Sequence, residues 1–435
     1  MLTEPGKLTI AGAPEGVDAL VLGELAEGRP GRQFLHVARD DAAMGRMAES
    51  LAFFASGLEV LTLPAWDCLP YDRVSPNPEI VSRRIATLTE LARAPRPAAS
   101  RIVVTTVNAL LQKVPPAAVF RDAVFRVALG GRLVHGELTH FVARNGYRRA
   151  ETVREPGEYA LRGGIIDVYP PGSSEPVRLD LFGDEVERIR TFDPLTQRTT
   201  GSLDRLELKA MSEVLLDEAA VERFRMRYRE LFGTVREGDP LYEAISAGRA
   251  HIGMEHWLPL FYDELETILD QVPGAAVTFD PQADGAIATR LETIQEFYAA
   301  RKSLADADRA TLYFPVPPET LFLDRPALDA ALAARAVGSF SPFKAPAGAG
   351  TVDAGGRAAR DFADARAQPE INLFDAVRAH IAAEQRAGRR VVVAGYSPGA
   401  RDRLGTLLGE HGVSNAATLS DWRVRDTLPP DQVGL

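Results

Sequence analysis

Two patterns of apolar positions alternate along the first quarter of the chain. Residues 34–37, 58–63 and 102–105 are short apolar runs typical of buried strands. Residues 41–55 and 79–91, which lie between them, carry apolar side chains at helical spacing. Strands that alternate with helices in this way form largely parallel sheets covered by helices. The pattern therefore predicts an α/β fold for this part of the chain.

The pattern changes after residue 116. From about 123 to 208 short strands dominate, separated by turn sequences such as Gly-Gly at 163–164. Apolar and polar residues alternate along 177–182, and Gly-Asp at 183–184 is typical of a hairpin turn into the next strand. These features predict a small antiparallel domain set into the chain.

Helical periodicity returns at 213–231 and 240–250, and a Pro/Gly/Ala-rich stretch at 341–356 is typical of a linker. The elements expected after it are a helix at 373–387, a strand at 390–394 and a helix at 399–411. They predict the beginning of another α/β unit. It ends near Leu435, which leaves two interpretations: a very small terminal domain or a truncated chain.

Composition narrows the class of protein. The chain has 435 residues and a formal charge of −10, without a basic block that would indicate a general phosphate-binding scaffold. At about 150 residues per domain, this length suggests roughly three domains. The single Cys68 excludes an intrachain disulfide and a cysteine-based metal site. No apolar run is long enough for a membrane span, so we expect a soluble, cytoplasmic protein with no membrane partner.

The first strand-turn-helix stands where a nucleotide-binding protein carries its phosphate loop. Such a loop needs glycine at its first position and ends in Gly-Lys-Ser/Thr, because the ammonium group holds phosphates and the hydroxyl binds magnesium. Here Ala11 stands at the first position and Gly16 at the later glycine. Val17 replaces the lysine and Asp18 the hydroxyl. The sequence therefore predicts a degenerate loop, with neither a nucleotide cofactor nor catalysis in this chain.

Residues 395–399 match the Gly-x-Ser-x-Gly pattern of a hydrolase nucleophile, with Ser397 at its centre. A hydrolase also needs an acid and a histidine downstream, and only His411 follows, on the next predicted helix. The alternative is that Ser397 caps that helix and Pro398 begins it. The pattern favours the cap over a serine hydrolase.

No metal site is predicted. His135 and His140 are five residues apart, as are His251 and His256, whereas zinc pairs on a helix usually stand four apart. These histidines are interpreted as structural. The acidic pair at 184–185 ends a strand and is better explained as a turn.

One strand suggests a surface for a partner. If Val177 and Leu179 face the core, period-two alternation directs Phe182 and Arg178 to the opposite face. Arginine and aromatic residues are enriched at the energetic centres of protein interfaces, although single exposed aromatics are also common. An interaction surface and an isolated exposed residue both remain open on this pattern alone.

Several long segments carry a resemblance to a known family. They are residues 69–88, 157–170, 176–185 with 192–198, and 253–261. In this order they resemble the N-terminal region of the transcription-repair coupling factors, the Mfd family, and more distantly the excision-repair protein UvrB. The likeness covers about residues 8–340, and the last domain resembles the small third domain of the family more loosely.

The resemblance implies an architecture. It is an α/β fold in which a degenerate helicase-like (RecA-like, P-loop-type) parallel-sheet domain is split by an inserted β-rich α+β domain and followed by a small α/β domain. The implied ranges are 1–121 and 208–340 for the two halves, 122–207 for the insert and 355–435 for the third domain. UvrB differs in having a working ATP site and a long DNA-threading hairpin, for which residues 69–78 leave no room.

The resemblance also implies a function. In both families the inserted domain binds UvrA, and the positions that match the family's contact residues are Arg162, Arg178 and Phe182. The implied role is an adaptor that recruits UvrA to DNA damage at a stalled RNA polymerase. In the family, RNA polymerase, double-stranded DNA, ATP and magnesium are bound by later domains. The alternative function is an ATP-dependent DNA-remodelling enzyme of the UvrB type.

Overall fold

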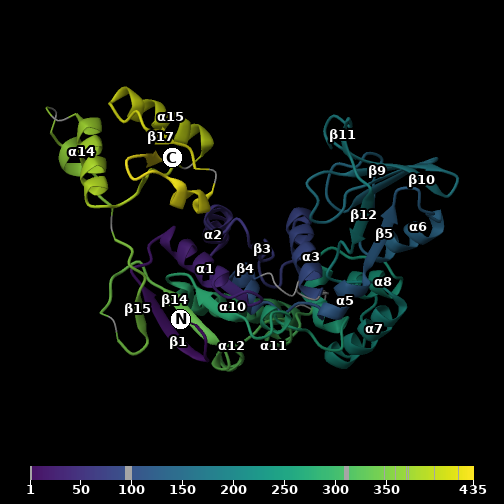
Figure 1. The fold of residues 1–435 in the computed structure, drawn as a ribbon. Helices are drawn as coiled ribbons and strands as arrows, with labels where there is room; N and C mark the ends of the chain where they lie inside the picture. The colour runs from purple at the N-terminus through teal and green to yellow at the C-terminus, as the bar shows by residue number, and fades with distance from the viewer. Residues whose placement is uncertain are drawn as a thin grey trace. The chain divides into compact units, whose positions relative to one another are not determined.

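The computed structural model describes residues 2–93, 100–307, 313–346, 348–357, 359–368, 370, 372–395, 397–419 and 421–435, with the backbone alone at His135, Asp306 and Ala307. The chain forms two compact units, each described here by itself (Figure 1). The first contains residues 1–9, 29–48 and 59–340, and the second contains 10–28, 49–58 and 341–435. The four domain ranges implied by the resemblance remain predictions.

A parallel sheet forms the centre of the first unit. Its strands follow the order β14-β13-β2-β4-β3, and every pair among them is parallel. The strands are β2 (Gln33–Ala38), β3 (Glu59–Leu63), β4 (Arg101–Thr106), β13 (Ala276–Phe279) and β14 (Ala336–Phe340). All six residues of β4 are buried, as expected for a strand covered on both faces. The predicted α/β fold is confirmed.

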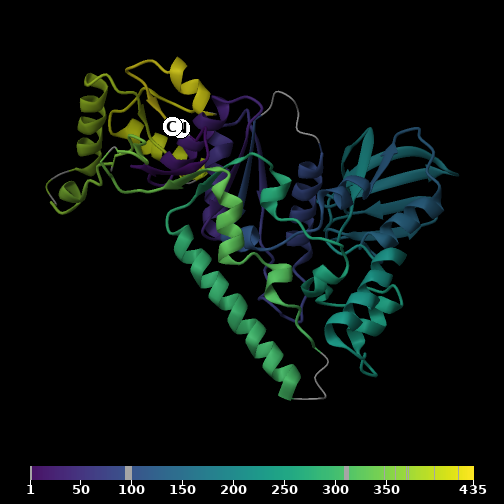
Figure 2. The same ribbon diagram turned by 90° about the horizontal axis from the view of Figure 1, so that it is seen from below.

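Helices make up much of the rest of the first unit, and α10 is the longest of those described (Figure 2). They are α3 (Pro78–Ala92), α4 (Val107–Leu111), α5 (Ala117–Asp122), α7 (Glu218–Phe232), α8 (Pro240–Ser246), η1 (Met254–Leu260), α9 (Ile268–Gln271), α10 (Ala283–Ala307), α11 (Pro318–Leu321) and α12 (Arg325–Ala333). Helix α2 (Asp41–Phe54) begins in the first unit and ends in the second. In the described ranges, no helix combines the length and the apolar character that a bilayer span requires.

The predicted start of α7 at residue 213 is wrong. The helix begins at Glu218, because the Asp217 carboxylate accepts the Ala220 N–H at 2.8 Å and caps the first turn. The following helix also ends earlier than predicted, at Ser246.

The inserted part is built from β-strands and one helix. Its six-stranded sheet has the order β11-β10-β9-β8-β7-β6, and a two-stranded sheet pairs β5 with β12. The elements are β5 (Val124–Ala128), α6 (His135–Arg144), β6 (Arg148–Arg149), β7 (Glu158–Arg162), β8 (Ile165–Val168), β9 (Val177–Phe182), β10 (Glu185–Phe192), β11 (Thr199–Ser202) and β12 (Arg205–Lys209). The largely antiparallel character is confirmed, whereas α6 was not predicted.

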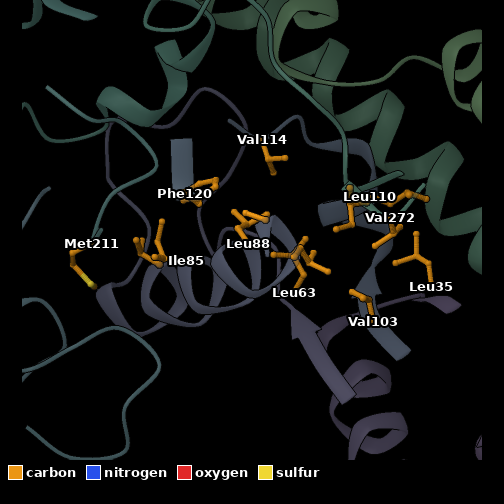
Figure 3. Packing of buried hydrophobic residues seen from close by; sticks show 14 of the residues in the cluster. Leu35, Leu63, Ile85, Leu88, Val103, Leu110, Val114, Phe120, Met211 and Val272 are labelled. Carbon is orange, nitrogen blue, oxygen red and sulfur yellow. The ribbon is translucent and has the colours of Figure 1, made fainter. Parts of the chain in front are cut away.

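One hydrophobic core runs through both parts of the first unit. Figure 3 shows Ile85 and Leu88 of α3 with Leu63 of the parallel sheet on one side and Met211, which follows β12, further along the helix. The cluster continues into the insert through Leu179 of β9. Helix α3 therefore anchors the insert by burying apolar area toward both parts.

The segment that follows β3 carries no hairpin. Residues 64–77 contain no strand, although Tyr71 is fully buried among them. The Ser75 hydroxyl donates to Glu255 at 2.8 Å, and Asp67 accepts the Asn77 N–H at 2.9 Å. The expected departure from UvrB in this segment stays a prediction.

The second unit contains the first helix and the C-terminal α/β unit. Its elements are α1 (Val17–Glu27), β15 (Thr351–Asp353), α13 (Ala363–Arg366), α14 (Leu373–Arg386), β16 (Val391–Val392), α15 (Pro398–Glu410), β17 (Ala416–Ala417), η2 (Trp422–Thr427) and β18 (Val433–Gly434). Strands β16, β18 and β17 make a small parallel sheet. The predicted helices are confirmed, and the strand expected at 390–394 has only two residues. Strand β1 (Gly6–Ala11) begins in the first unit and ends in the second.

Candidate partner-binding surface

Strand β9 has one face in the core and one face outside it. Val177 and Leu179 are buried at 1% and 0% exposure, whereas the Phe182 side chain is 75% exposed. The alternation predicted for this strand is therefore confirmed, including the outward direction of Phe182.

The register of the sheet places the three predicted contact residues on one face. Arg162 of β7 pairs with Ile165 of β8, which pairs with Asp180 of β9. Paired residues of neighbouring strands project on the same side, and so do residues two apart on one strand. Arg162, Arg178 and Phe182 therefore share the non-core face of the sheet, which we call the outer face.

Arg178 is held inside the sheet by an ion pair. Its Nε and Nη2 donate to the two carboxylate oxygens of Asp167 at 2.6 and 2.9 Å. Asp167 is 2% exposed, and the guanidinium lies 4.6 Å from the centre of the Phe192 ring. These hydrogen bonds raise the pKa of Arg178 further above its usual range. Arg178 thus stabilises the outer face, and only a fifth of its side chain, 19%, is exposed.

Arg162 lies at the exposed end of β7. Its one side-chain hydrogen bond in the described residues is donated to the Thr152 hydroxyl at 3.5 Å, a distance at which a hydrogen bond is weak. Its guanidinium therefore remains available to a partner carboxylate, for which arginine offers two parallel donors.

Phe182 immediately precedes a two-residue hairpin turn. It pairs with Glu185 across Gly183 and Asp184, and Gly183 has a φ of +62°, which glycine adopts without steric cost. The Asp184 carboxylate accepts from Arg132 at 3.1 Å. The interpretation of this acidic pair as a turn is confirmed, and the turn presents Phe182 at the end of the hairpin.

The degenerate phosphate loop uses its backbone donors within the chain. The Gly16 and Ala19 N–H groups donate to the Asp18 carboxylate at 2.9 and 2.7 Å. The Gly12 N–H donates to the Phe343 carbonyl, and the Ala13 N–H to the Ser341 carbonyl, both at 2.8 Å. A phosphate bound at the start of a helix accepts from such donors, and these four already have acceptors within the chain.

Ser397 caps a helix. Its hydroxyl accepts the Ala400 N–H at 3.1 Å, and Pro398 is the first residue of α15. His411 follows the other end of this helix, about 20 Å away at ~1.5 Å per residue, and stacks on Phe374. The cap is confirmed, and the structure does not bring the serine and the histidine together. Tyr396 of the motif lies outside the described residues.

The histidine side chains that the structure describes do not gather into a metal centre. Burial lowers the pKa of His256 to about 4, so this ring is neutral near pH 7. Its Nε2 lies 3.8 Å from the Cys68 Sγ, and burial raises the pKa of that thiol to about 12. Within the described part of the chain, no group of three metal-ligating side chains is present. The side chain of His135 is not described.

One buried ion pair was not predicted from the sequence. Arg84 of α3 donates to Glu213 at 2.6 and 3.1 Å, and both side chains are almost fully buried, at 0% and 1% exposure. Trp66 Nε1 donates to the same carboxylate at 3.0 Å. One signal was present in the sequence, because Arg84 lies on the apolar face that α3 forms with Val81, Ile85 and Leu88.

The outer face lies in a part of the chain that matches a known domain family. Residues 125–213 match the family model of the UvrB interaction domain, which contains the whole outer face. The chain is 34% identical to a transcription-repair-coupling factor of Haemophilus influenzae over 326 residues, which is 74% of this chain and 27% of that protein. This chain is a relative of the transcription-repair-coupling factors.

Two further coupling factors match a large part of this chain at similar identity. The coupling factor of Escherichia coli is 32% identical over 70% of the chain, and that of Myxococcus xanthus is 35% identical over 61%. The matched parts are 26% and 24% of those proteins. The chain thus spans about a quarter of the length of the coupling factors it matches, and the match corresponds to their N-terminal region.

Proposed function

We propose that this chain is an adaptor of transcription-coupled nucleotide excision repair that recruits UvrA to DNA damage at a stalled RNA polymerase. The observation that carries the proposal is the outer face of a UvrB interaction domain, which Phe182, 75% exposed, shares with Arg162. Exposed aromatic and arginine side chains on one face are typical of the energetic centre of a protein interface. RNA polymerase and DNA are partners that we assign to the parts of the coupling factors that this chain does not match.

Direct binding tests this proposal. We expect the purified chain to co-elute with UvrA in size-exclusion chromatography, because Phe182 and Arg162 are exposed on its outer face. Bovine serum albumin serves as the control protein for non-specific association. Separate elution of the chain and UvrA at concentrations of about 10 µM, where even a micromolar complex forms, would contradict the adaptor role.

We further propose that the chain itself needs no nucleotide and performs no catalysis, in contrast to an ATP-dependent DNA-remodelling enzyme. The Asp18 carboxylate accepts the N–H groups at the start of α1 and adds a negative charge where phosphates would bind. Val17 offers no cation to hold them. A full-length relative with a motor elsewhere would carry ATP and magnesium there.

The expected result is no saturable ATP binding and no ATP hydrolysis at about 1 mM nucleotide, a concentration at which phosphate-loop enzymes are normally occupied. Equilibrium dialysis with labelled ATP and a phosphate-release assay measure the two quantities. Turnover that survives repurification and disappears in a Gly16→Asp variant would instead support the remodelling enzyme.

A further inference from the structure

The outer face has a closed end and an open end. At the closed end, Ala160, Tyr169 and Phe192 are buried in a small cluster, next to the Arg178–Asp167 pair. Toward the hairpin, Ile165 and Phe182 are exposed, at 39% and 75%. A partner can therefore contact only the end of the face that the cluster leaves uncovered.

Two arginines of this face are already paired with carboxylates of the same sheet. Arg178 is paired with Asp167, and Arg190 is paired with Asp180. Both pairs are internal to the sheet, so each arginine already has a carboxylate partner. Charge that is free to attract a partner must come from other residues.

Arg188 of β10 supplies such a charge. A bulge between Val186 and Arg188 shifts the alternation by one residue, so that Val186 is buried and Arg188 pairs with Asp180. The Arg188 side chain is therefore exposed on the outer face. Among the described residues its guanidinium has no hydrogen bond or ion pair. Arg162 is a second arginine of the open end without an ion pair among the described residues, and its one hydrogen bond there is with the distant Thr152 hydroxyl.

The register places these two arginines on opposite sides of the apolar residues. Arg162, Ile165, Asp180 and Arg188 follow one another across four neighbouring strands. With about 4.8 Å between strands, the Cα atoms of Arg162 and Arg188 are roughly 14 Å apart. Ile165 lies between them, and Phe182 follows two residues after Asp180.

We infer that Arg188 is a further contact residue of this surface, and that its partner presents two carboxylates on either side of an apolar pocket that receives Phe182. This inference rests on the proposed function, and it names the chemistry by which UvrA would be recognised. An acidic protein surface fits better than nucleic acid, because the centre of the strip is apolar and the half-buried Asp180 lies within it.

The test measures the affinity of UvrA for the whole chain and for four variants by a method such as biolayer interferometry. Arg188→Glu is expected to weaken binding about tenfold or more, because it places like charges together. Arg188→Lys is expected to stay within about threefold of the original affinity, since it keeps the charge. Arg205→Glu is the matched control: Arg205 is exposed and without an ion pair in the described residues, but it lies on the separate β5–β12 sheet. Phe182→Ala reports on the surface as a whole.

Salt provides a second measurement. The difference between the original chain and Arg188→Glu should shrink between about 0.05 and 0.5 M salt, where the screening length falls severalfold. If Phe182→Ala weakens binding and Arg188→Glu does not, the inference is overturned and the proposed function stands. An equal loss in Arg205→Glu would also overturn it, because net charge would then explain the effect. Absence of binding by the original chain overturns both.

Discussion

Phe182→Ala is expected to weaken the binding of UvrA by at least ~2 kcal/mol, about thirtyfold, at an unchanged melting temperature. The ring is 75% exposed at the end of a hairpin, so its removal costs little buried area in the free chain. In a complex it would enter an apolar pocket and lose that exposure. Titration calorimetry and thermal unfolding measure the two quantities on the same preparation.

Leu195→Ala is the matched control for this prediction. Leu195 is also a strongly exposed apolar residue of the matched domain, at 80%, but it lies beyond the end of β10. Its truncation should leave both the affinity and the melting temperature unchanged. A folded Phe182→Ala chain with the original affinity would refute the surface. A fall of several degrees in its melting temperature would show that the ring supports the fold instead.

The largest effect on stability is expected at the buried Arg84–Glu213 pair. Arg84→Met should lower the free energy of unfolding by about 3–5 kcal/mol, because it leaves a carboxylate buried without its cation. Helix α3 and the residues after β12 are joined by this pair, so the insert should also loosen. Urea unfolding followed by tryptophan fluorescence is well suited, because Trp66 donates a hydrogen bond to the same carboxylate.

Two further variants separate this mechanism from a general loss of arginine. Arg83 is the neighbouring residue, and its exposed pair with Glu79 should contribute no more than about 0.5 kcal/mol, so Arg83→Met should change little. The double variant Arg84→Met with Glu213→Gln should recover much of the loss, since it removes the unpaired charge and keeps an acceptor for Trp66. Equal destabilisation by Arg83→Met and Arg84→Met would contradict the buried pair as the cause.

Several residues of this chain could be assigned their place from the sequence alone. The alternation along 177–182 was sufficient to place Phe182 outside the core, because side chains of a strand alternate between faces whatever the strand pairs with. The cap at Ser397 was also predictable, since a cap involves only residues three apart. The lack of a Gly-Lys-Ser/Thr sequence at 16–18, where Val17 and Asp18 follow Gly16, was visible directly.

The roles of the arginines depended on contacts between distant segments. Arg178 and Arg188 look alike in the sequence, yet Arg178 is paired with Asp167 on the neighbouring strand and Arg188 with no carboxylate of the described residues. Arg84 is paired with Glu213, which lies 129 positions further along the chain. The two donors that Gly12 and Ala13 give to carbonyls beyond residue 340 are equally remote.

The alternation of apolar and polar residues therefore determined the α/β class, the antiparallel insert and the exposed face of β9. The tertiary structure decided which charged groups on that face are already paired and which remain for a partner. The physical reason is that side-chain direction follows from the local backbone geometry of a helix or strand. A charge, in contrast, is neutralised by whichever group the register and the packing bring within hydrogen-bonding distance.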